Sequence, residues 1–369
     1  MTAVVHPPDP HQLIQAVVSA QWYSVMGRPP LDVDEDFFAT GASVIDAATY
    51  ASQLSDAFGR EVSVQLVYEN PTVRSLCSAI RSGSAGLRSR ILPLCLDGDG
   101  APLLFIPGAH GNPAVNDRLT EPIFGRRVYG LEFRGLLPGD GEPLRSLEEV
   151  VEDITHEIGQ WRTAEPVHLA GYCTGAVYAM EVARELIGIG WPVRSVTMLS
   201  PSTQPQGPYQ PDFDELLTDR VAHIAASEGL ADYSGPPVAS ALFAELRAGG
   251  KEVAEEYVEE VIARARMFVS NFYALTRYKP PPTPVGTPVT VLLPQGEDGD
   301  LALSYWPDVL APTTTFETFG CDHLDVPGNP AVMAAMAKAM HAADREAEDA
   351  DTAGSHNRRE AAAPAPPPS

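Results

Sequence analysis

The sequence predicts an α/β protein with a parallel sheet and a helical lid, preceded by a small all-helical unit. Short apolar runs alternate with helical patterns from about residue 99 onward, as in parallel α/β sheets. Before residue 83, apolar residues instead recur at helical spacing. A third pattern, VHLAGYCTGAVYAM at residues 167–180, reads as a strand, a tight turn between glycines, and a helix.

Composition limits the class of protein. With 369 residues, of which 44% are hydrophobic, the chain can bury a large core. Its net charge of −24 argues against binding to nucleic acid or to anionic membrane surfaces. The four cysteines are far apart in the sequence, which predicts neither a disulfide framework nor a metal site. No signal peptide and no apolar stretch long enough to span a bilayer are evident, so a cytoplasmic protein is expected.

Residues 10–83 are predicted to form a small four-helix bundle. HQLIQAVVSAQWYSVMG and DAATYASQLSDAFG have apolar residues at helical spacing, and the second ends at a glycine suited to a helix C-cap. NPTVRSLCSAIRSG begins with a helix-start signal and closes on Ser-Gly. Residues 84–98 are predicted to be a linker.

Residues 99–342 are predicted to form the α/β domain. Its apolar runs include PLLFIPG, RVYGLEF, VHLAGYC and RSVTMLS, with helical patterns between several of them. The segment at about 203–280 interrupts the late strands and suits a lid over an active site. Residues 343–369 are charged and then rich in Ala and Pro, so a disordered tail is expected there.

Three segments of the α/β domain predict nucleophilic catalysis. The turn GYCTG is the layout of a nucleophile elbow, in which Cys173 takes the place usual for serine. Upstream, LLFIPGAHGNP is a strand followed by a Gly-rich loop, suited to supply an oxyanion-hole amide. Downstream, TFETFGCDHLDVPGNP places His323 after the last apolar run, where the base is expected. Because three segments occur in the order that such sites require, catalysis is the favoured interpretation.

These segments resemble the α/β-hydrolase thioesterases that end polyketide and nonribosomal peptide assembly lines. The resemblance extends from about residue 101 to 342 and includes GYCTGA, FIPGAHG, Trp306 and CDHLDVPGNP. It implies that Cys173 is the nucleophile and His323 the base. It also implies that the oxyanion-hole amides belong to Ala109 and Thr174. Asp322 corresponds to the residue that precedes the family's histidine, not to the triad acid.

The acid of a catalytic triad is where the sequence departs from that family. Members commonly place the acid after the strand that follows the elbow helix, and here that position is Ser200. A second position follows the next-to-last strand, where PQGEDGD offers Glu297, Asp298 and Asp300. Asp298 has the best spacing and is predicted as the orienting acid. The alternative is a Cys173–His323 pair with a neutral hydrogen bond from Ser200.

The helical unit resembles the carrier-protein domains of the same assembly lines. DEDFFATGASVIDAATYASQLSDAFG and VYENPTVRSLCSAI carry this resemblance. In that family a serine at the start of the second helix receives phosphopantetheine, and Val44 stands at that position here. Ser43 lies one residue early and is predicted to be a helix N-cap. The unit is therefore interpreted as a pseudo-carrier.

Together these resemblances imply an enzyme of natural-product biosynthesis. It is expected to take an acyl group from an acyl or peptidyl carrier protein, or from an assembly-line synthase, onto Cys173. Release by cyclisation, by amide or ester formation, or by transfer would follow. The alternatives are a hydrolytic editing thioesterase and a non-catalytic docking subunit. No covalently bound cofactor and no metal are expected, because the substrate arrives on the phosphopantetheine arm of a partner. His110, His156 and His168 are predicted to be surface or packing residues.

Overall fold

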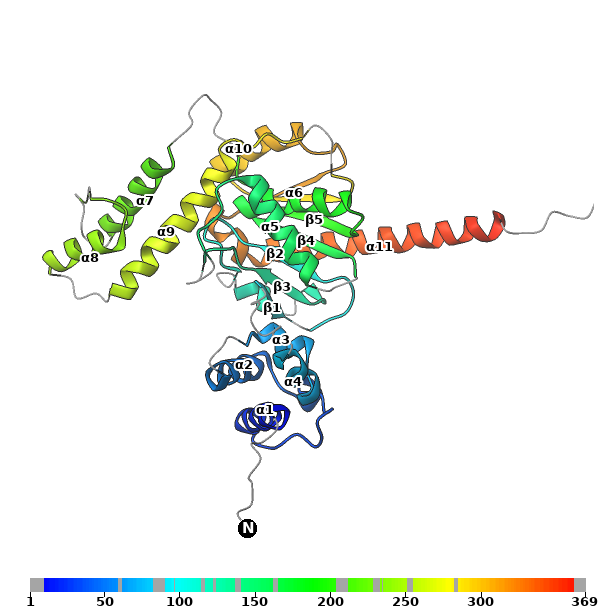
Figure 1. Cartoon of the computed structure of the whole chain (residues 1–369). Helices are drawn as coiled ribbons and strands as arrows, with labels where there is room; N and C mark the ends of the chain where they lie inside the picture. The colour runs from blue at the N-terminus through cyan, green and yellow to red at the C-terminus, as the bar shows by residue number, and fades with distance from the viewer. Residues whose placement is uncertain are drawn as a thin grey trace, which may run out of the picture. The chain divides into compact units, whose positions relative to one another are not determined.

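The computed structural model describes most of the chain, and its elements are labelled in Figure 1. The described residues are 10–361 apart from 59–61, 82–89, 96, 114–116, 122–123, 137–140, 162–164, 204–211, 228–232, 234, 251–254 and 282–284. The chain divides into two compact units, Met1–Leu92 and Pro93–Ser369.

In its described residues, the first unit has four α-helices around an aromatic core. Their bounds are α1 Pro10–Met26, α2 Val44–Phe58, α3 Val64–Glu69 and α4 Val73–Arg81. The ring of Trp22 meets the ring of Phe37 edge-on at 5.0 Å, and Phe37 stacks on Tyr50 at 4.9 Å. All three side chains are buried, whereas Phe38 is partly exposed. The predicted helical bundle is confirmed.

The second unit is built on a seven-stranded sheet with the order β1-β3-β2-β4-β5-β6-β7. The strands are β1 Ile91–Cys95, β2 Leu103–Ile106, β3 Val128–Leu131, β4 Val167–Tyr172, β5 Val193–Leu199, β6 Val289–Pro294 and β7 Thr315–Phe319. Neighbouring strands from β3 to β7 pair in parallel. The predicted α/β fold is therefore confirmed.

Residues 84–98 were expected to be a linker, but part of this segment forms strand β1. Residues 84–89 and 96 lie outside the described part of the chain. Ile91–Cys95 lies at the edge of the sheet, beside β3. Its sequence, ILPLC, contains Pro93, which weakens the strand signal because proline cannot donate a ladder hydrogen bond. An edge strand tolerates proline, since one side of the strand has no partner.

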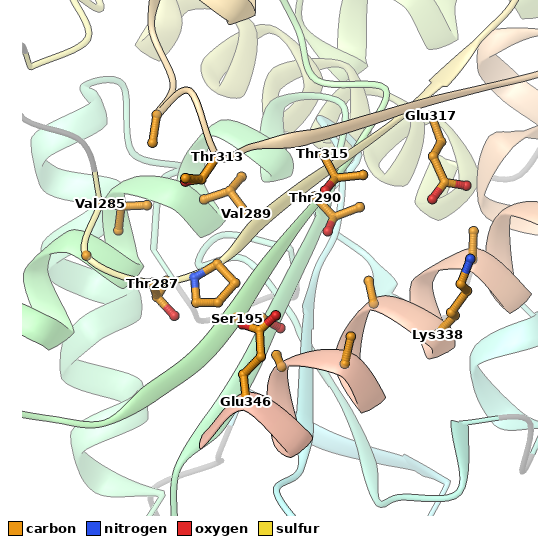
Figure 2. Close-up of a pocket in the computed structure, with 17 residues that line it drawn as sticks. Ser195, Val285, Thr287, Val289, Thr290, Thr313, Thr315, Glu317, Lys338 and Glu346 are labelled. Carbon is orange, nitrogen blue, oxygen red and sulfur yellow. The ribbon is translucent and has the colours of Figure 1, made fainter. Parts of the chain in front are cut away.

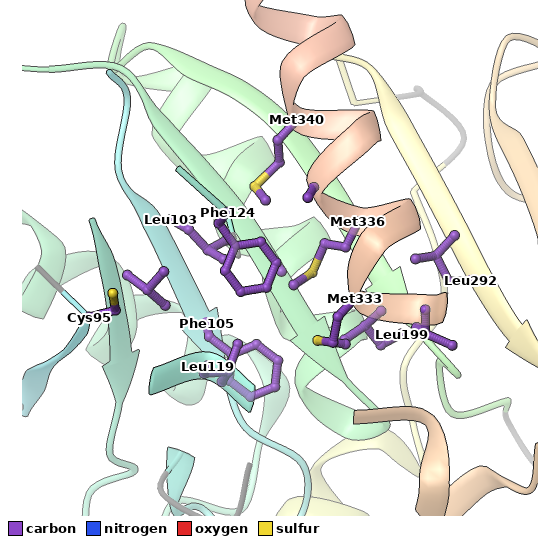
Figure 3. Close-up of a cluster of buried hydrophobic side chains, with 14 of the residues drawn as sticks. Cys95, Leu103, Phe105, Leu119, Phe124, Leu199, Leu292, Met333, Met336 and Met340 are labelled. Carbon is purple, nitrogen blue, oxygen red and sulfur yellow. The ribbon is translucent and has the colours of Figure 1, made fainter. Parts of the chain in front are cut away.

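Helices cover both faces of the sheet. Helix α6, Thr174–Gly188, packs on β4 and β5, and α5, Leu147–Gln160, packs on α6. Helix α11, Pro330–Ala361, packs on β5 and β6. Figure 3 shows Met333, Met336 and Met340 of this helix pointing at strand residues that include Phe105 and Leu199. Because all four residues of β2 are buried, neither face of the central sheet is open to water.

Helix α11 also corrects the tail predicted at 343–369, because it continues to Ala361. Ala343 is buried, and Asp344 forms a 2.9 Å ion pair with the buried Arg126. A helix that is already nucleated adds further turns at little cost, and the Ala- and Glu-rich sequence has high helix propensity. The charged segment for which disorder was expected therefore continues a packed helix as far as Ala361.

The Asp344→Asn substitution is expected to lower the free energy of unfolding by about 3 kcal/mol, because it leaves the Arg126 charge buried without its carboxylate. Chemical denaturation at neutral pH measures this loss. The control is Glu346→Gln, an exposed position in the same helix, which should change stability by under about 0.5 kcal/mol. Equal stabilities for the two variants would contradict the role given to the ion pair.

A helical insertion lies between β5 and β6, where the lid was predicted. It contains α7 Phe213–Ser227, α8 Ala239–Ala248 and α9 Glu255–Leu275. These helices form a core of their own, which includes Leu217, Leu246 and Ile262. Figure 1 shows the three helices side by side, with α9 leading back to the sheet. Among the described residues, no helix has the length and apolar character needed to cross a membrane.

Candidate active site

The turn between β4 and α6 holds Cys173 in a strained backbone conformation. Its φ is 56° and its ψ is −118°, values that a residue with a side chain rarely adopts. A Cβ on Gly171 would lie 2.0 Å from the Gly175 carbonyl oxygen. A Cβ on Gly175 would lie 2.1 Å from the Pro107 carbonyl oxygen. Both glycines are therefore required by close backbone approach, and the turn presents the cysteine at the carboxyl end of β4.

Hydrogen-bond donors surround the Cys173 sulfur. The backbone amides of Ala109 and Thr174, the two predicted to form an oxyanion hole, both act as hydrogen-bond donors toward Sγ. The Ser202 hydroxyl lies 3.3 Å from Sγ. No local sequence pattern signals Ser202, because its position depends on how the chain turns after β5.

The charge state of the thiol follows from these surroundings. Burial raises the pKa of Cys173, while the Ser202 hydroxyl and the two amides act to lower it. The net pKa stays above the ordinary value. The resting group is therefore a neutral thiol, not the preformed thiolate that a helix N-terminus alone would favour. A base must take its proton during attack.

His323 lies at the same end of the sheet, at the start of the short helix η7, His323–Gly328. Its ring packs against the Tyr172 ring at 5.0 Å, and the Tyr172 hydroxyl donates a 3.0 Å hydrogen bond to the His323 carbonyl. Burial lowers the pKa of His323, and the charge of Asp298 partly opposes this shift. The imidazole is therefore neutral at pH 7 and available as a base.

The orienting partner of the imidazole is Ser200. Its hydroxyl lies 2.7 Å from His323 Nδ1, and its backbone φ is 42°. Asp298, predicted as the orienting acid, is exposed in the first turn of α10, Glu297–Tyr305, and forms no hydrogen bond with the ring. In this structure Ser200, not Asp298, lies at Nδ1, and sequence spacing alone does not determine which way a side chain points. The neutral Ser200 alternative matches the geometry.

No direct hydrogen bond joins Cys173 and His323 among the described residues. The sulfur is hydrogen-bonded to Ser202, and Nδ1 of the imidazole is hydrogen-bonded to Ser200. The His323 ring packs against Tyr172, the residue that precedes Cys173, so both groups lie at the same end of the sheet. Catalytic hydrogen bonds are often long in the absence of substrate and shorten when it binds. Because Ser200 holds Nδ1, Nε2 is the nitrogen left for the thiol proton.

A buried network from the lid fixes the loop that carries Ala109. Asn271 of α9 donates a 3.0 Å hydrogen bond from Nδ2 to the Ala109 carbonyl. Tyr178 of α6 donates to the Asn271 carbonyl at 3.0 Å and lies 3.3 Å from its Oδ1. Both side chains are almost fully buried. The network connects the elbow helix, the lid and the oxyanion loop, and sequence reasoning missed it because the three segments are far apart in the chain.

We expect Asn271→Ala to lower kcat about 10- to 100-fold, because the loop loses the bond that fixes one oxyanion-hole amide. The KM for a short acyl thioester should change little. The control is Ser270→Ala, which removes a neighbouring buried hydroxyl from the same helix. A loss shared equally by both variants would show that lid packing, not loop position, causes the effect.

The other predicted residues lie elsewhere. His168 is buried, with Nδ1 2.8 Å from the Ser195 hydroxyl and Nε2 3.1 Å from Asp344. His156 lies on α5, 2.6 Å from Gln160, and Trp306 is fully buried. His110 packs against Phe268 of the lid at 5.1 Å. His168 and Trp306 thus have structural positions, whereas His110 borders the candidate site.

A cavity of about 680 Å³ lies at the opposite edge of the sheet. Figure 2 shows it lined by Ser195, Thr290 and Thr315 from the strands and by Lys338 and Glu346 from α11. These strand residues are near the amino ends of β5, β6 and β7, whereas Cys173 follows the carboxyl end of β4. Sites in parallel sheets lie at the carboxyl ends, so this cavity is not the candidate site. Among the described residues, no group of His, Cys, Asp and Glu could hold a metal ion.

Two family models match this chain. A family model described as a thioesterase domain matches residues 101–338. A second, described as a phosphopantetheine attachment site, matches residues 16–80. Similar curated proteins include indigoidine synthase from Dickeya dadantii, 27% identical over 65% of this chain and 15% of its own length. The dimodular nonribosomal peptide synthase of Bacillus subtilis is 26% identical over 75% of this chain and 12% of its own length. The chain thus spans less than a fifth of these relatives.

Solved structures share the fold. A four-domain nonribosomal peptide synthetase bound to AMP and glycine covers 92% of this chain, with 26% of its own length aligned, a TM-score of 0.56 and 22% identity. The type II thioesterase of the borrelidin biosynthetic cluster covers 68% of this chain, with 98% of its own length aligned, a TM-score of 0.51 and 18% identity. At these identities the likeness concerns architecture.

Proposed function

Because the chain belongs to the thioesterase family, we propose that it transfers acyl groups from a carrier-protein thioester through Cys173. The observation that supports this most directly is the position of the cysteine. Its side chain is at the tip of a strained elbow, with two amides at the sulfur and a neutral imidazole nearby. The similarity to nonribosomal peptide synthases favours a role in natural-product biosynthesis, with an assembly-line carrier as the partner.

The first half-reaction is a thiol exchange. Nε2 of His323 takes the Cys173 proton while the sulfur attacks the acyl carbonyl carbon. The resulting oxyanion accepts hydrogen bonds from the amides of Ala109 and Thr174, a role that their position beside the Cys173 sulfur supports. The carbon–sulfur bond to the pantetheine arm then breaks, and the arm leaves as a thiol with the proton from His323. One thioester replaces another, so this step is close to thermoneutral.

The second half-reaction releases the acyl group. His323 takes a proton from an incoming amine, hydroxyl or thiol, which attacks the acyl–Cys173 carbonyl carbon. The bond between that carbon and Sγ then breaks, and His323 returns the proton to the Cys173 sulfur. A thioester is more reactive toward amines than the oxoester that serine would form, so the cysteine favours cyclisation, amide formation or transfer. His323 needs only an orienting partner for this role, and Ser200 provides one at 2.7 Å.

We further propose that the attached carrier-like unit carries no arm. Helix α2 begins at Val44, whose side chain has no oxygen to receive phosphopantetheine. The Ser43 hydroxyl accepts a 3.2 Å hydrogen bond from the Asp46 amide, and the Ser43 amide donates a 2.7 Å hydrogen bond to Asp46 Oδ2. This reciprocal arrangement is that of a helix capping box. The residues therefore do not fit the group that the family carries, and the substrate is expected to arrive on a separate carrier.

Incubation with a phosphopantetheinyl transferase and coenzyme A tests the second proposal. The wild-type chain should gain no mass, whereas Val44→Ser should gain one arm, because that substitution restores the hydroxyl at the family position. Mass gain by the wild-type chain, mapped to Ser43, would contradict the proposal.

Product analysis tests the transfer reaction. An acyl carrier protein loaded in trans with an acyl chain that bears an internal amine should give a cyclic amide and free carrier. Free acid as the sole product would indicate a hydrolytic editing enzyme instead. Absence of any Cys173-dependent product would indicate a docking subunit.

A further inference from the structure

A cation from the lid lies close to the oxyanion loop. The guanidinium carbon of Arg220, on α7, is 4.2 Å from the centre of the Phe268 ring on α9. The Phe268 ring also contacts the ring of His110, at 5.1 Å between ring centres. His110 directly follows Ala109, whose amide faces the Cys173 sulfur. Phe268 and the loop at Ala109 and His110 therefore connect Arg220 to the nucleophile through successive contacts.

Arg220 has no anionic partner within the described residues. Its Nε is buried and makes no hydrogen bond, and no ion pair involves its side chain there. Burial lowers the pKa of Arg220, and no carboxylate among the described residues acts in the opposite direction. In a chain with a net charge of −24, a half-buried guanidinium without a carboxylate is unexpected, because buried charges are normally paired.

His110 is the polar group nearest to Arg220 on the oxyanion loop. Partial desolvation lowers the pKa of His110, and the charges of Arg220 and Arg264 lower it further, so the imidazole is neutral at pH 7. A bound anion would offset the cost of keeping the Arg220 charge half-buried. The aromatic side of the same cluster continues to Phe272, which stacks on Phe268 at 5.9 Å and is 44% exposed. The cluster thus combines a positive centre with an exposed aromatic surface.

We propose that Arg220, assisted by His110, binds an anionic group of the acyl thioester while Phe268 and Phe272 contact an apolar part of the same ligand. This inference rests on the proposed function, since it concerns the ligand that reaches Cys173. The anion is a carboxylate of the acyl group or the phosphate of the pantetheine arm. Both offer oxygens that a guanidinium binds through paired, charge-assisted hydrogen bonds.

Three thioesters separate the two sources of the anion. They are pentanoyl-pantetheine, which is neutral, glutaryl-pantetheine, which adds a terminal carboxylate, and pentanoyl-phosphopantetheine, which adds the arm phosphate. The Arg220→Gln variant should lower kcat/KM about 10- to 100-fold for one of the two anionic substrates, since a hydrogen bond to a charged group is worth about 1.5–3 kcal/mol. The neutral thioester should be turned over as by the wild-type protein.

Matched variants make the result specific. Arg220→Lys, which keeps the charge, should recover part of the loss. Arg247→Gln removes an exposed lid arginine that lies over Phe243 and should change no substrate's kcat/KM. Equal losses for all three thioesters in Arg220→Gln would overturn the proposal, because they would reflect lid packing. No loss for any substrate would overturn it as well.

A binding measurement separates this inference from the proposed function. Non-reactive thioether analogues of the three substrates are titrated by calorimetry into Cys173→Ala protein, with and without Arg220→Gln. If no thioester acylates Cys173 but the anionic analogue binds in an Arg220-dependent way, the anion site stands and the transfer reaction fails. If acylation occurs and binding of all analogues is independent of Arg220, the transfer reaction stands and the anion site fails.

Discussion

Replacing Cys173 with alanine is expected to reduce acyl transfer about 10⁴-fold or more, because the residual reaction has no nucleophile and depends on binding and the oxyanion hole alone. The backbone strain at this position, with φ at 56°, belongs to the turn and is unchanged by the substitution. Fold and stability should therefore match the wild-type protein. Turnover of an acyl-pantetheine thioester, measured as release of free thiol, gives the rate.

Cys321 provides the control for this loss. It is also a partly exposed free thiol, two residues before His323. Cys321→Ala should retain activity within a few-fold, since its sulfur has no part in the proposed reaction. Loss of activity in Cys321→Ala with retention in Cys173→Ala would reverse the assignment of the nucleophile.

If serine replaces Cys173 as the nucleophile, kcat should come to depend on a carboxylate at position 200, which the wild-type chain lacks. Cys173→Ser is expected to lower kcat about 10²- to 10⁴-fold, because a hydroxyl depends on a base supported by a negative charge, and Ser200 is neutral. Adding Ser200→Asp to that variant should restore about 10²-fold or more. In the Cys173 background the same aspartate should change kcat less than about 10-fold, because a thiol gives up its proton more easily.

The backbone conformation at position 200 permits the Ser200→Asp substitution, and Ser200→Asn is its matched control. Position 200 has a φ of 42°, a region that aspartate and asparagine tolerate better than most residues. Ser200→Asn has the same size as Ser200→Asp without the charge, and it should not restore the serine enzyme. If Ser200→Asp stimulated the cysteine and serine enzymes equally, the idea that the thiol compensates for the missing acid would be wrong.

The sequence was most informative at positions where the backbone geometry permits only one or two residue types. Gly171 and Gly175 flank the elbow because a Cβ at either place would collide with the backbone, and this constraint is visible as a motif. The position of His323 was similarly predictable. From β4 to β7 the strands follow one another in the sheet in the same order as in the chain, and parallel strands bring the residues that follow them to one edge.

The parts that escaped prediction depend on the direction of side chains or on distant segments. Asp298 and Ser200 were both candidates for orienting His323, and only the structure shows which of them points at Nδ1. Asn271 reaches Ala109 from a lid helix far along the chain, so no local pattern signals it. Strand β1 was hidden by Pro93, which an edge strand tolerates.

Intact-mass analysis tests the central claim most directly. The protein is mixed with a simple acyl-pantetheine thioester, quenched in acid within one turnover, and digested to locate the modification. We predict a mass increase of one acyl group on the peptide that contains Cys173, absent from Cys173→Ala and retained in Cys321→Ala. An acyl group on another residue, or turnover without any acyl–Cys173 intermediate, would contradict the proposed reaction.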